Sequence, residues 1–263
     1  MAAASSIAPA VLDAAIMIEK RSSTADRIAN DPIAAPLAAS NKIRVVAPHE
    51  YKQAAECLAE AFKEDHCVRY AIDTPDRMHW TEEERYQLHK QALEYVVYAH
   101  CLKGLVTSVG PNFDSVACWM PPGKNIDDLF TICRSGMWRL GYQLSREGRD
   151  RYFKEFLPLL SSTKAEVLGE RDDHSWYLNY IGTKTGSRGK GYARQLIEHI
   201  SAVADRAGQA CYLESSHEVN LKIYQKMGFD LRKQIYLTRS HEEIRMDVMV
   251  REPRKNLSEK MKI

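Results

Sequence analysis

A strand, a glycine-rich cationic loop and an amphipathic helix follow one another in this chain, and that succession constrains the fold more than any other feature. The segment SWYLNYIGT (175–183) is rich in aromatic residues and predicts a strand. The stretch GSRGKGYARQL (186–196) then combines three glycines with three cations. An apolar stripe over 196–207 predicts a helix that ends at Gly208. Because the first N–H groups of a helix lack internal partners, the pattern is typical of a phosphate-binding loop.

Two common nucleotide-binding patterns do not fit this loop. A Walker loop requires Ser or Thr after its lysine, but Lys190 is followed by Gly191. A dinucleotide fingerprint requires a third glycine where Arg194 stands, and no early βαβ unit surrounds it. The residues alone leave two interpretations open: a phosphate-binding loop and a solvated basic helix start.

Two ordered motifs decide between these interpretations. The loop contains Arg188, Gly191 and Ala193, which match the pattern Gln/Arg-x-x-Gly-x-Gly/Ala. The second motif consists of LESS (213–216), Asn220, Tyr224 and MGF (227–229). With these motifs, the segment 176–237 resembles the GCN5-related N-acetyltransferase (GNAT) superfamily, whose acetyl-CoA loop has the first pattern. Many relatives carry a proline where this chain has Thr185, which leaves backbone contacts to phosphate possible.

The resemblance implies a fold. It predicts an α+β (mixed α/β) GNAT fold with a central, mostly antiparallel, splayed sheet flanked by helices. The helical pattern over about 125–172 is expected to form an insertion before the cofactor-binding strand. Together with the stretch VACWMPPG, this insertion makes the chain look like the puromycin N-acetyltransferase branch in particular.

The expected domain organisation follows from composition along the chain. Residues 1–40 are rich in Ala and Ser and predict a flexible tail, with a short helical pattern around 11–20. Acids match bases in number there, which argues against a transit peptide. A single acetyltransferase domain is expected over 41–251, followed by a basic C-terminal tail over 252–263.

The resemblance also implies a cosubstrate site. The pyrophosphate of acetyl-CoA is expected on the amides of 188–194, and the pantetheine arm along 180–183. An amide near Ile181 would then stabilise the oxyanion of the thioester. The expected cofactor-binding residues are Ile181, Gly182, Thr183, Arg188, Gly189, Lys190, Gly191, Tyr192, Ala193, Arg194 and Asn220.

Two residues match catalytic positions of the family. Tyr224 matches the general acid that protonates the leaving thiolate, although its ring could instead fill the core. Glu214 stands where some relatives carry a general base, and a carboxylate that orients the substrate is the alternative. His217 is a rival base because its pKa is ordinarily near neutral. Asn220 could bind coenzyme A or cap its helix.

Composition excludes several other classes. The net charge of +2 argues against nucleic-acid or membrane partners, and the apolar runs are far shorter than the ~20 residues of a spanning helix. Six cysteines without a CxxC spacing predict buried free thiols in a reducing compartment, and hence a cytoplasmic protein. Cysteines and histidines form no ligand pairs, so no metal is expected. Most aromatic side chains are expected in the core, namely Tyr70, Trp80, Tyr86, Trp119, Trp138, Tyr142 and Phe153.

The predicted function is therefore acetyl transfer from acetyl-CoA to the primary amine of a small molecule, by direct attack in a ternary complex. A detoxification or metabolic role is expected, in a monomer or homodimer. Two alternatives remain: a protein or peptide N-acetyltransferase, and a non-catalytic acyl-CoA-binding module. The failed Walker and dinucleotide patterns disfavour a nucleotide-binding protein.

Overall fold

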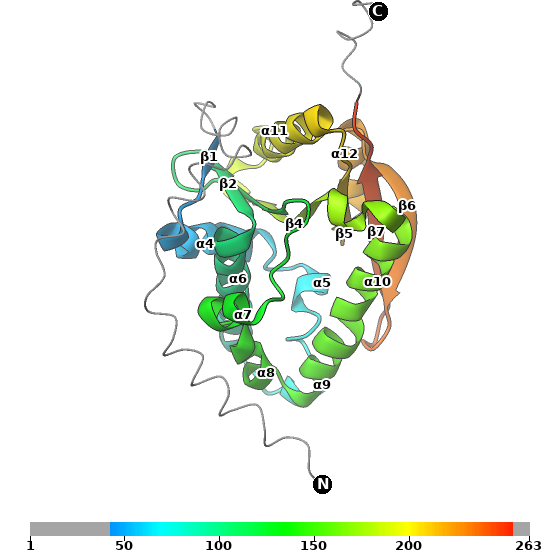
Figure 1. Cartoon of the computed structure of the whole chain (residues 1–263). Coiled ribbons are helices and arrows are strands. Elements are labelled where there is room, and N and C mark those ends of the chain that lie inside the picture. The colour runs from blue at the N-terminus through cyan, green and yellow to red at the C-terminus, as the bar shows by residue number, and fades with distance from the viewer. Residues whose placement is uncertain (1–42, 255–263) are drawn as a thin grey trace, which may run out of the picture. The chain divides into compact units, whose positions relative to one another are not determined.

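A seven-stranded sheet organises the protein, whose computed structural model describes residues 43–254 (Figure 1). The strand order across the sheet is β1-β2-β3-β4-β5-β7-β6. The strands are β1 (Ile43–Val45), β2 (Leu105–Val109), β3 (Ser115–Met120), β4 (Trp176–Thr183), β5 (Cys211–Ser215), β6 (Asp230–Leu237) and β7 (Ile244–Arg251). Among the strands of the described residues, only β4 and β5 pair in parallel. The predicted mixed, mostly antiparallel sheet is confirmed.

Helices connect and cover these strands. They are α4 (Tyr51–Ala61), α5 (His66–Arg69), α6 (Glu82–Lys103), α7 (Leu129–Ser135), α8 (Leu140–Gln143), α9 (Arg146–Arg149), α10 (Leu157–Leu168), α11 (Tyr192–Ala207) and α12 (Glu218–Lys226). At the start of α6, Thr81 and Glu84 form a reciprocal capping box. The predicted end of α11 is also confirmed, because Gly208 adopts the left-handed conformation with φ of 66°.

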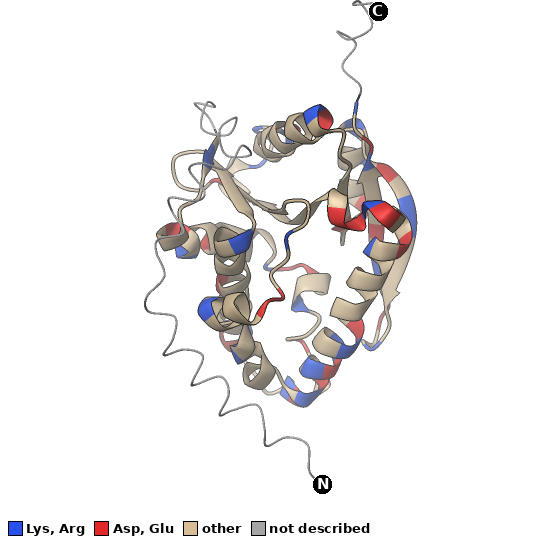
Figure 2. Ribbon diagram, in the orientation of Figure 1, with Lys and Arg blue, Asp and Glu red and all other residues tan. Residues whose placement is uncertain are grey.

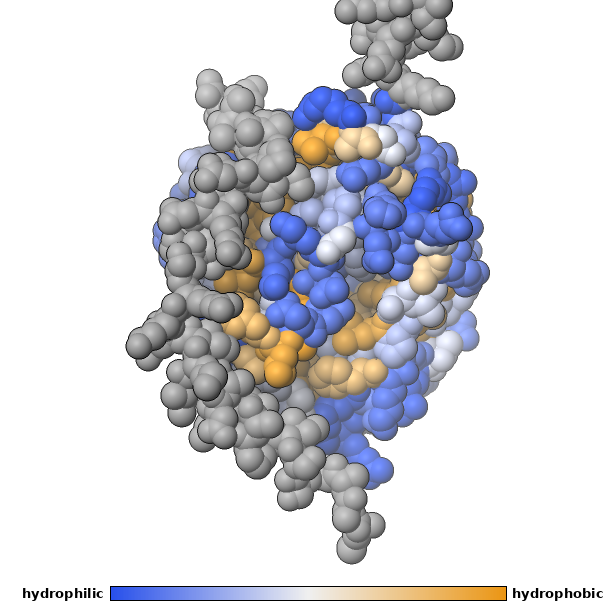
Figure 3. Space-filling model, in the orientation of Figure 1, coloured by the Kyte–Doolittle hydropathy of each residue, from blue (hydrophilic) through white to orange (hydrophobic). Residues whose placement is uncertain are grey.

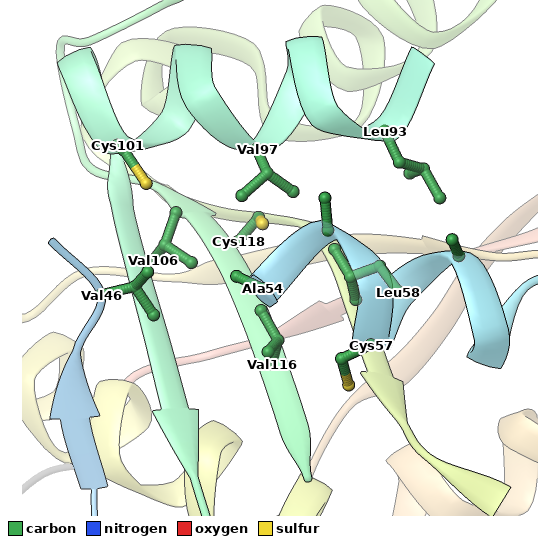
Figure 4. Packing of buried hydrophobic residues seen from close by; sticks show 12 residues of the cluster. Val46, Ala54, Cys57, Leu58, Leu93, Val97, Cys101, Val106, Val116 and Cys118 are labelled. Carbon is green, nitrogen blue, oxygen red and sulfur yellow. The ribbon is translucent and has the colours of Figure 1, made fainter. Parts of the chain in front are cut away.

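The two faces of the sheet carry different helices. Helix α11 lies on one face, whereas α4, α6 and α10 lie on the other (Figure 1). On the α4 face, Leu58 of α4 and Val97 of α6 pack against Val106 of β2 and Val116 of β3 (Figure 4). A second apolar cluster joins Tyr212 and Val248 of β5 and β7 to the α10 side. These clusters hold the central strands from which the site is built.

The expected helical insertion lies between β3 and β4. It forms α7 to α10 with short 3-10 and π segments between them, rather than one long helix. The expectation that most aromatic residues lie in the core holds for Tyr70 and Trp119, which are buried. It is wrong for Trp138 and Tyr142, whose side chains are 51% and 60% exposed on the insertion.

The six cysteines are free thiols as expected, and all but Cys133 are buried. Within residues 43–254, no helix is both long and apolar enough to cross a membrane. The expectations for residues 1–40, and most of those for 252–263, lie outside the described residues.

Gly182 lets α4 approach β4 closely. A Cβ atom at this position would lie 2.7 Å from Ala61 Cβ and 2.9 Å from Leu58 Cδ2. We therefore expect Gly182→Ala to lower the free energy of unfolding by about 1–3 kcal/mol through overpacking. Gly186→Ala is the matched control, since nothing lies within 4 Å of its Cβ position. Denaturant unfolding of both variants measures the effect, and equal stabilities would contradict this role.

Candidate active site

The parallel strands β4 and β5 separate partway along their length. Their pairing covers Trp176 to Leu178 on β4, and the last pair joins Leu178 to Leu213. Beyond it, β4 remains paired with β3 and β5 remains paired with β7. The predicted splay is therefore present, and one backbone edge of β4 is left without a partner strand.

A β-bulge at Asn179 accompanies the splay. Trp119 of β3 faces Leu178, whereas the next residue, Cys118, faces Tyr180, so Asn179 is the extra residue. A bulge interrupts the alternation of side chains along a strand. As a result, Tyr180 packs on Phe62 of the α4 face, where strict alternation would have turned it away.

The register shows which amides of β4 are open. Lys184 N donates to Asp114 O at 2.9 Å, so Gly182, two residues earlier, also occupies a hydrogen-bonded position opposite β3. In an antiparallel pair such positions alternate. The peptide groups of Ile181 and Thr183 therefore point away from β3, into the splay.

The glycine-rich loop leads from β4 into the start of α11. Gly189 and Gly191 have φ of 79° and 74°, a region that favours glycine. Among the described residues, the amides of 189–191 donate no hydrogen bond, and the first amides of α11 have no partner within the helix. This row of free N–H groups can bind a phosphate.

The cations of the loop are less available than the sequence suggested. Arg194 pairs with Glu198 at 2.7 Å along the exposed side of α11. Lys190 Nζ donates to Ser187 Oγ, and Arg188 Nε contacts Thr183 O at 3.5 Å. The backbone amides, rather than these side chains, are the strongest anion-binding feature.

A cavity of about 1000 Å³ opens beside the splay. It brings together four predicted site residues from three elements, namely Ile181 of β4, Glu214 of β5, and Asn220 and Tyr224 of α12. The loop residues 188–194 do not line it. The loop joining β3 to α7 borders the cavity and carries Lys and Asp residues across this face (Figure 2).

The walls of the cavity are largely apolar. Besides Tyr224, the Phe and Tyr residues of the lining are Phe62, Tyr152, Phe153, Phe156, Tyr177 and Tyr180. Phe153, expected in the core, is 42% exposed and belongs to this lining. Figure 3 shows hydrophobic residues bordering the hydrophilic centre of this face.

Glu214 has the electrostatic character of a base. Burial raises the pKa of its carboxyl from 4.5 to about 7, against a smaller lowering by the phenols of Tyr177 and Tyr212. Its Oε1 atom completes no hydrogen bond within residues 43–254. A carboxylate with this pKa can accept a proton near neutral pH.

Tyr224 has the character of a proton donor. Its ring packs edge-on against Phe229, and burial raises the pKa of its hydroxyl to about 12. The hydroxyl therefore stays protonated at neutral pH. Because Tyr224 also lines the cavity, the alternative of a ring that only fills the core is disfavoured.

His217 and Asn220 differ in placement. His217 caps α12, because its Nδ1 accepts a hydrogen bond from Val219 N at 3.3 Å. It lines a neighbouring cavity of about 690 Å³ instead of the one with Tyr224. Asn220 lies within α12, where it does not cap the helix, and lines the main cavity.

Sequence reasoning missed four polar residues of the site. Tyr177 and Tyr212 flank Glu214, with ring centroids 5.3 Å apart. Asn179 and the buried His100 line the same cavity. Asn179 stands out in the sequence as the polar residue inside the strand WYLNYIGT, but its bulge could not be predicted from that pattern.

Comparisons with known proteins identify the family. The sequence model of a family described as an acetyltransferase (GNAT) domain matches residues 164–231. A protein of Schizosaccharomyces pombe described as an uncharacterized N-acetyltransferase is 48% identical over 205 residues. That match covers 78% of this chain and 80% of the yeast protein.

Solved structures share the fold at low identity. The arylalkylamine N-acetyltransferase 2 of Aedes aegypti is 15% identical, with a TM-score of 0.52 over 82% of this chain and all of that one. The polyamine N-acetyltransferase of Drosophila melanogaster is 13% identical, with a TM-score of 0.51 over 80% of this chain and 98% of that one. No comparison tests the finer likeness to the puromycin branch, which stays a prediction.

Proposed function

The chain belongs to the GNAT acetyltransferases, and on that premise we propose that it acetylates the primary amine of a small molecule. Acetyl-CoA is the cosubstrate of this family. The observation that carries the proposal is the meeting of Ile181, Glu214 and Tyr224 at one apolar cavity beside the splay. The arylalkylamine and polyamine enzymes that share the fold are named for small amines, which supports the same class of acceptor.

Each group then has a role in the transfer. The free amides of 189–194 bind the pyrophosphate, and the open edge of β4 binds the pantetheine arm. The Ile181 amide, which points into the splay, donates to the thioester oxygen as its charge develops. Asn220 lies in the cavity, where its amide can contact the same cosubstrate.

Bond changes balance without a further reactant. The amine nitrogen bonds to the acetyl carbon, and the excess proton on that nitrogen passes to Glu214. The C–S bond then breaks as Tyr224 donates its proton to the leaving sulfur. Burial holds the Tyr224 hydroxyl protonated, with a pKa of about 12, so it has a proton to donate as the thiolate forms.

The shape of the cavity favours a small acceptor over a peptide. The insertion helices and the loop 121–127 border it, and aromatic side chains cover much of its wall. A protein substrate would require an extended groove past Tyr224. The acceptor test below separates these two classes.

Ligand binding and an acceptor panel test the proposal. We expect acetyl-CoA and CoA to raise the melting temperature by mass action, while ATP and NADH leave it unchanged. Thiol release is then followed with 2-phenylethylamine, tryptamine, agmatine, putrescine and a lysine-containing peptide. We expect release with small amines and little with the peptide. Stabilisation only by ATP or NADH, or release only with the peptide, would overturn the proposal.

A further inference from the structure

Two polar side chains that the proposed chemistry leaves unused lie at the mouth of the splay. His100 of α6 is 0% exposed, and its Nδ1 lies 2.8 Å from the carbonyl oxygen of Val96. The side-chain amide of Asn179 faces the same ring. Within residues 43–254, neither His100 Nε2 nor Asn179 Oδ1 completes a hydrogen bond. Both residues line the main cavity.

The tautomer of His100 follows from its contact with Val96. A carbonyl oxygen can only accept, so Nδ1 carries the hydrogen. Burial lowers the pKa of the imidazole, which is therefore neutral, and Nε2 is a bare acceptor. Only a donor satisfies such an atom, and the side-chain amide of Asn179 can supply one if its nitrogen is the atom turned toward the ring.

The bare Nε2 atom of His100 favours one orientation of the Asn179 amide. Oxygen and nitrogen of a side-chain amide are assigned from their hydrogen bonds. The orientation that satisfies a neutral His100 has Nδ2 facing Nε2, and in that orientation the oxygen Oδ1 turns away from the ring and toward the cavity. His100 thus acts as a positioning residue that presents one neutral acceptor to whatever occupies the cavity.

The register places this acceptor opposite Glu214. Leu178 and Leu213 form the last pair of β4 and β5, so Asn179 and Glu214 are the first residues beyond it. The contact of Asn179 with His100 of α6 shows that its side chain lies on the face covered by α4, α6 and α10. Glu214 lies on that face too, beside Tyr177 and Tyr212.

We propose that Asn179 Oδ1 accepts a hydrogen bond from the reacting nitrogen of the acceptor, and that this contact selects primary over secondary amines. The inference rests on the proposed function. After attack, the nitrogen of a primary amine carries two hydrogens: one passes to Glu214 and the other bonds to Asn179. A secondary amine has one hydrogen at that stage, so it must forgo either the base or the amide.

The test compares 2-phenylethylamine with N-methyl-2-phenylethylamine in the full-length protein and in Asn179→Ala. A hydrogen bond to a charged group contributes about 1.5–3 kcal/mol, so we expect kcat/KM for the primary amine to fall about 10- to 100-fold. For the N-methyl amine we expect little change in kcat/KM. The ratio of kcat/KM for the primary amine to that for the N-methyl amine should therefore approach one. Calorimetric binding of 2-phenylethylamine to the CoA-saturated protein should weaken in parallel.

Controls separate this contact from general damage. Asn112→Ala removes an exposed turn amide and should leave the ratio unchanged. Asn179→Asp keeps an oxygen acceptor and should retain more of the preference for the primary amine than Asn179→Ala does. The melting temperature and the CoA affinity of each variant show whether it folds normally. An unchanged ratio in Asn179→Ala, with primary amines still acetylated by the wild type, overturns this inference alone. Absence of amine acetylation by the wild type overturns the proposed function instead.

Discussion

Replacing Tyr224 with phenylalanine is expected to lower kcat by about 10²–10⁴-fold, the usual contribution of a positioned general acid. The substitution removes only the hydroxyl oxygen and keeps the ring that packs against Phe229. Affinity for acetyl-CoA should therefore be retained. Steady-state kinetics and calorimetric titration measure the two quantities.

Tyr236→Phe is the matched control for this prediction. Tyr236 lies on β6, is 43% exposed and does not line the main cavity. Its loss of a hydroxyl should leave kcat unchanged. Full activity in Tyr224→Phe would remove Tyr224 from the mechanism and leave it as a packing residue.

The second large effect is expected from Glu214→Gln. A base must be deprotonated to act, so wild-type kcat/KM should rise with pH and level off above the carboxyl pKa of about 7. The variant should lose about 10²-fold in activity and lose this acid limb. A pH–rate profile with 2-phenylethylamine measures both, and an unchanged acid limb would assign it to another group.

Stability provides an independent readout of the same carboxyl. Its folded pKa lies above the unfolded value of 4.5, so its contribution to stability is lost as the pH rises from 4.5 to about 7. Glu214→Gln should therefore melt above the wild type at pH 8 and close to it at pH 4.5. Glu170→Gln, at an exposed site, should melt at the wild-type temperature at both pH values.

Much of the fold could be predicted because its signals are local. The strand 176–183, the loop and the helix up to Gly208 follow from residue type and from a glycine that can adopt positive φ. The breaks within the insertion could not be predicted, since apolar residues at helical spacing continue through them. Trp138 and Tyr142 show the same limit, because an aromatic residue type does not tell which face of a helix packs.

Some residues of the candidate site could also be predicted from the sequence, and others could not. The motif that contains Tyr224 and Asn220 indicates the cavity residues because their spacing on one helix is local. The contact between Asn179 and His100 joins a strand to a helix far away in sequence, and it depends on a one-residue bulge. The partners of Arg194 and Lys190 also depend on side-chain geometry that the loop sequence does not specify.

In the proposed reaction, the acetyl group passes directly from acetyl-CoA to the amine in a ternary complex. Cys67 is a thiol that lines the cavity, and burial raises its pKa well above the ordinary value, so it is a poor nucleophile. The most direct measurement is mass spectrometry of protein and products after incubation with one equivalent of acetyl-CoA, with and without 2-phenylethylamine. For direct transfer we expect N-acetylated amine only when the amine is present, and an unmodified protein in both samples. An acetylated protein, or CoA release without product, would contradict it.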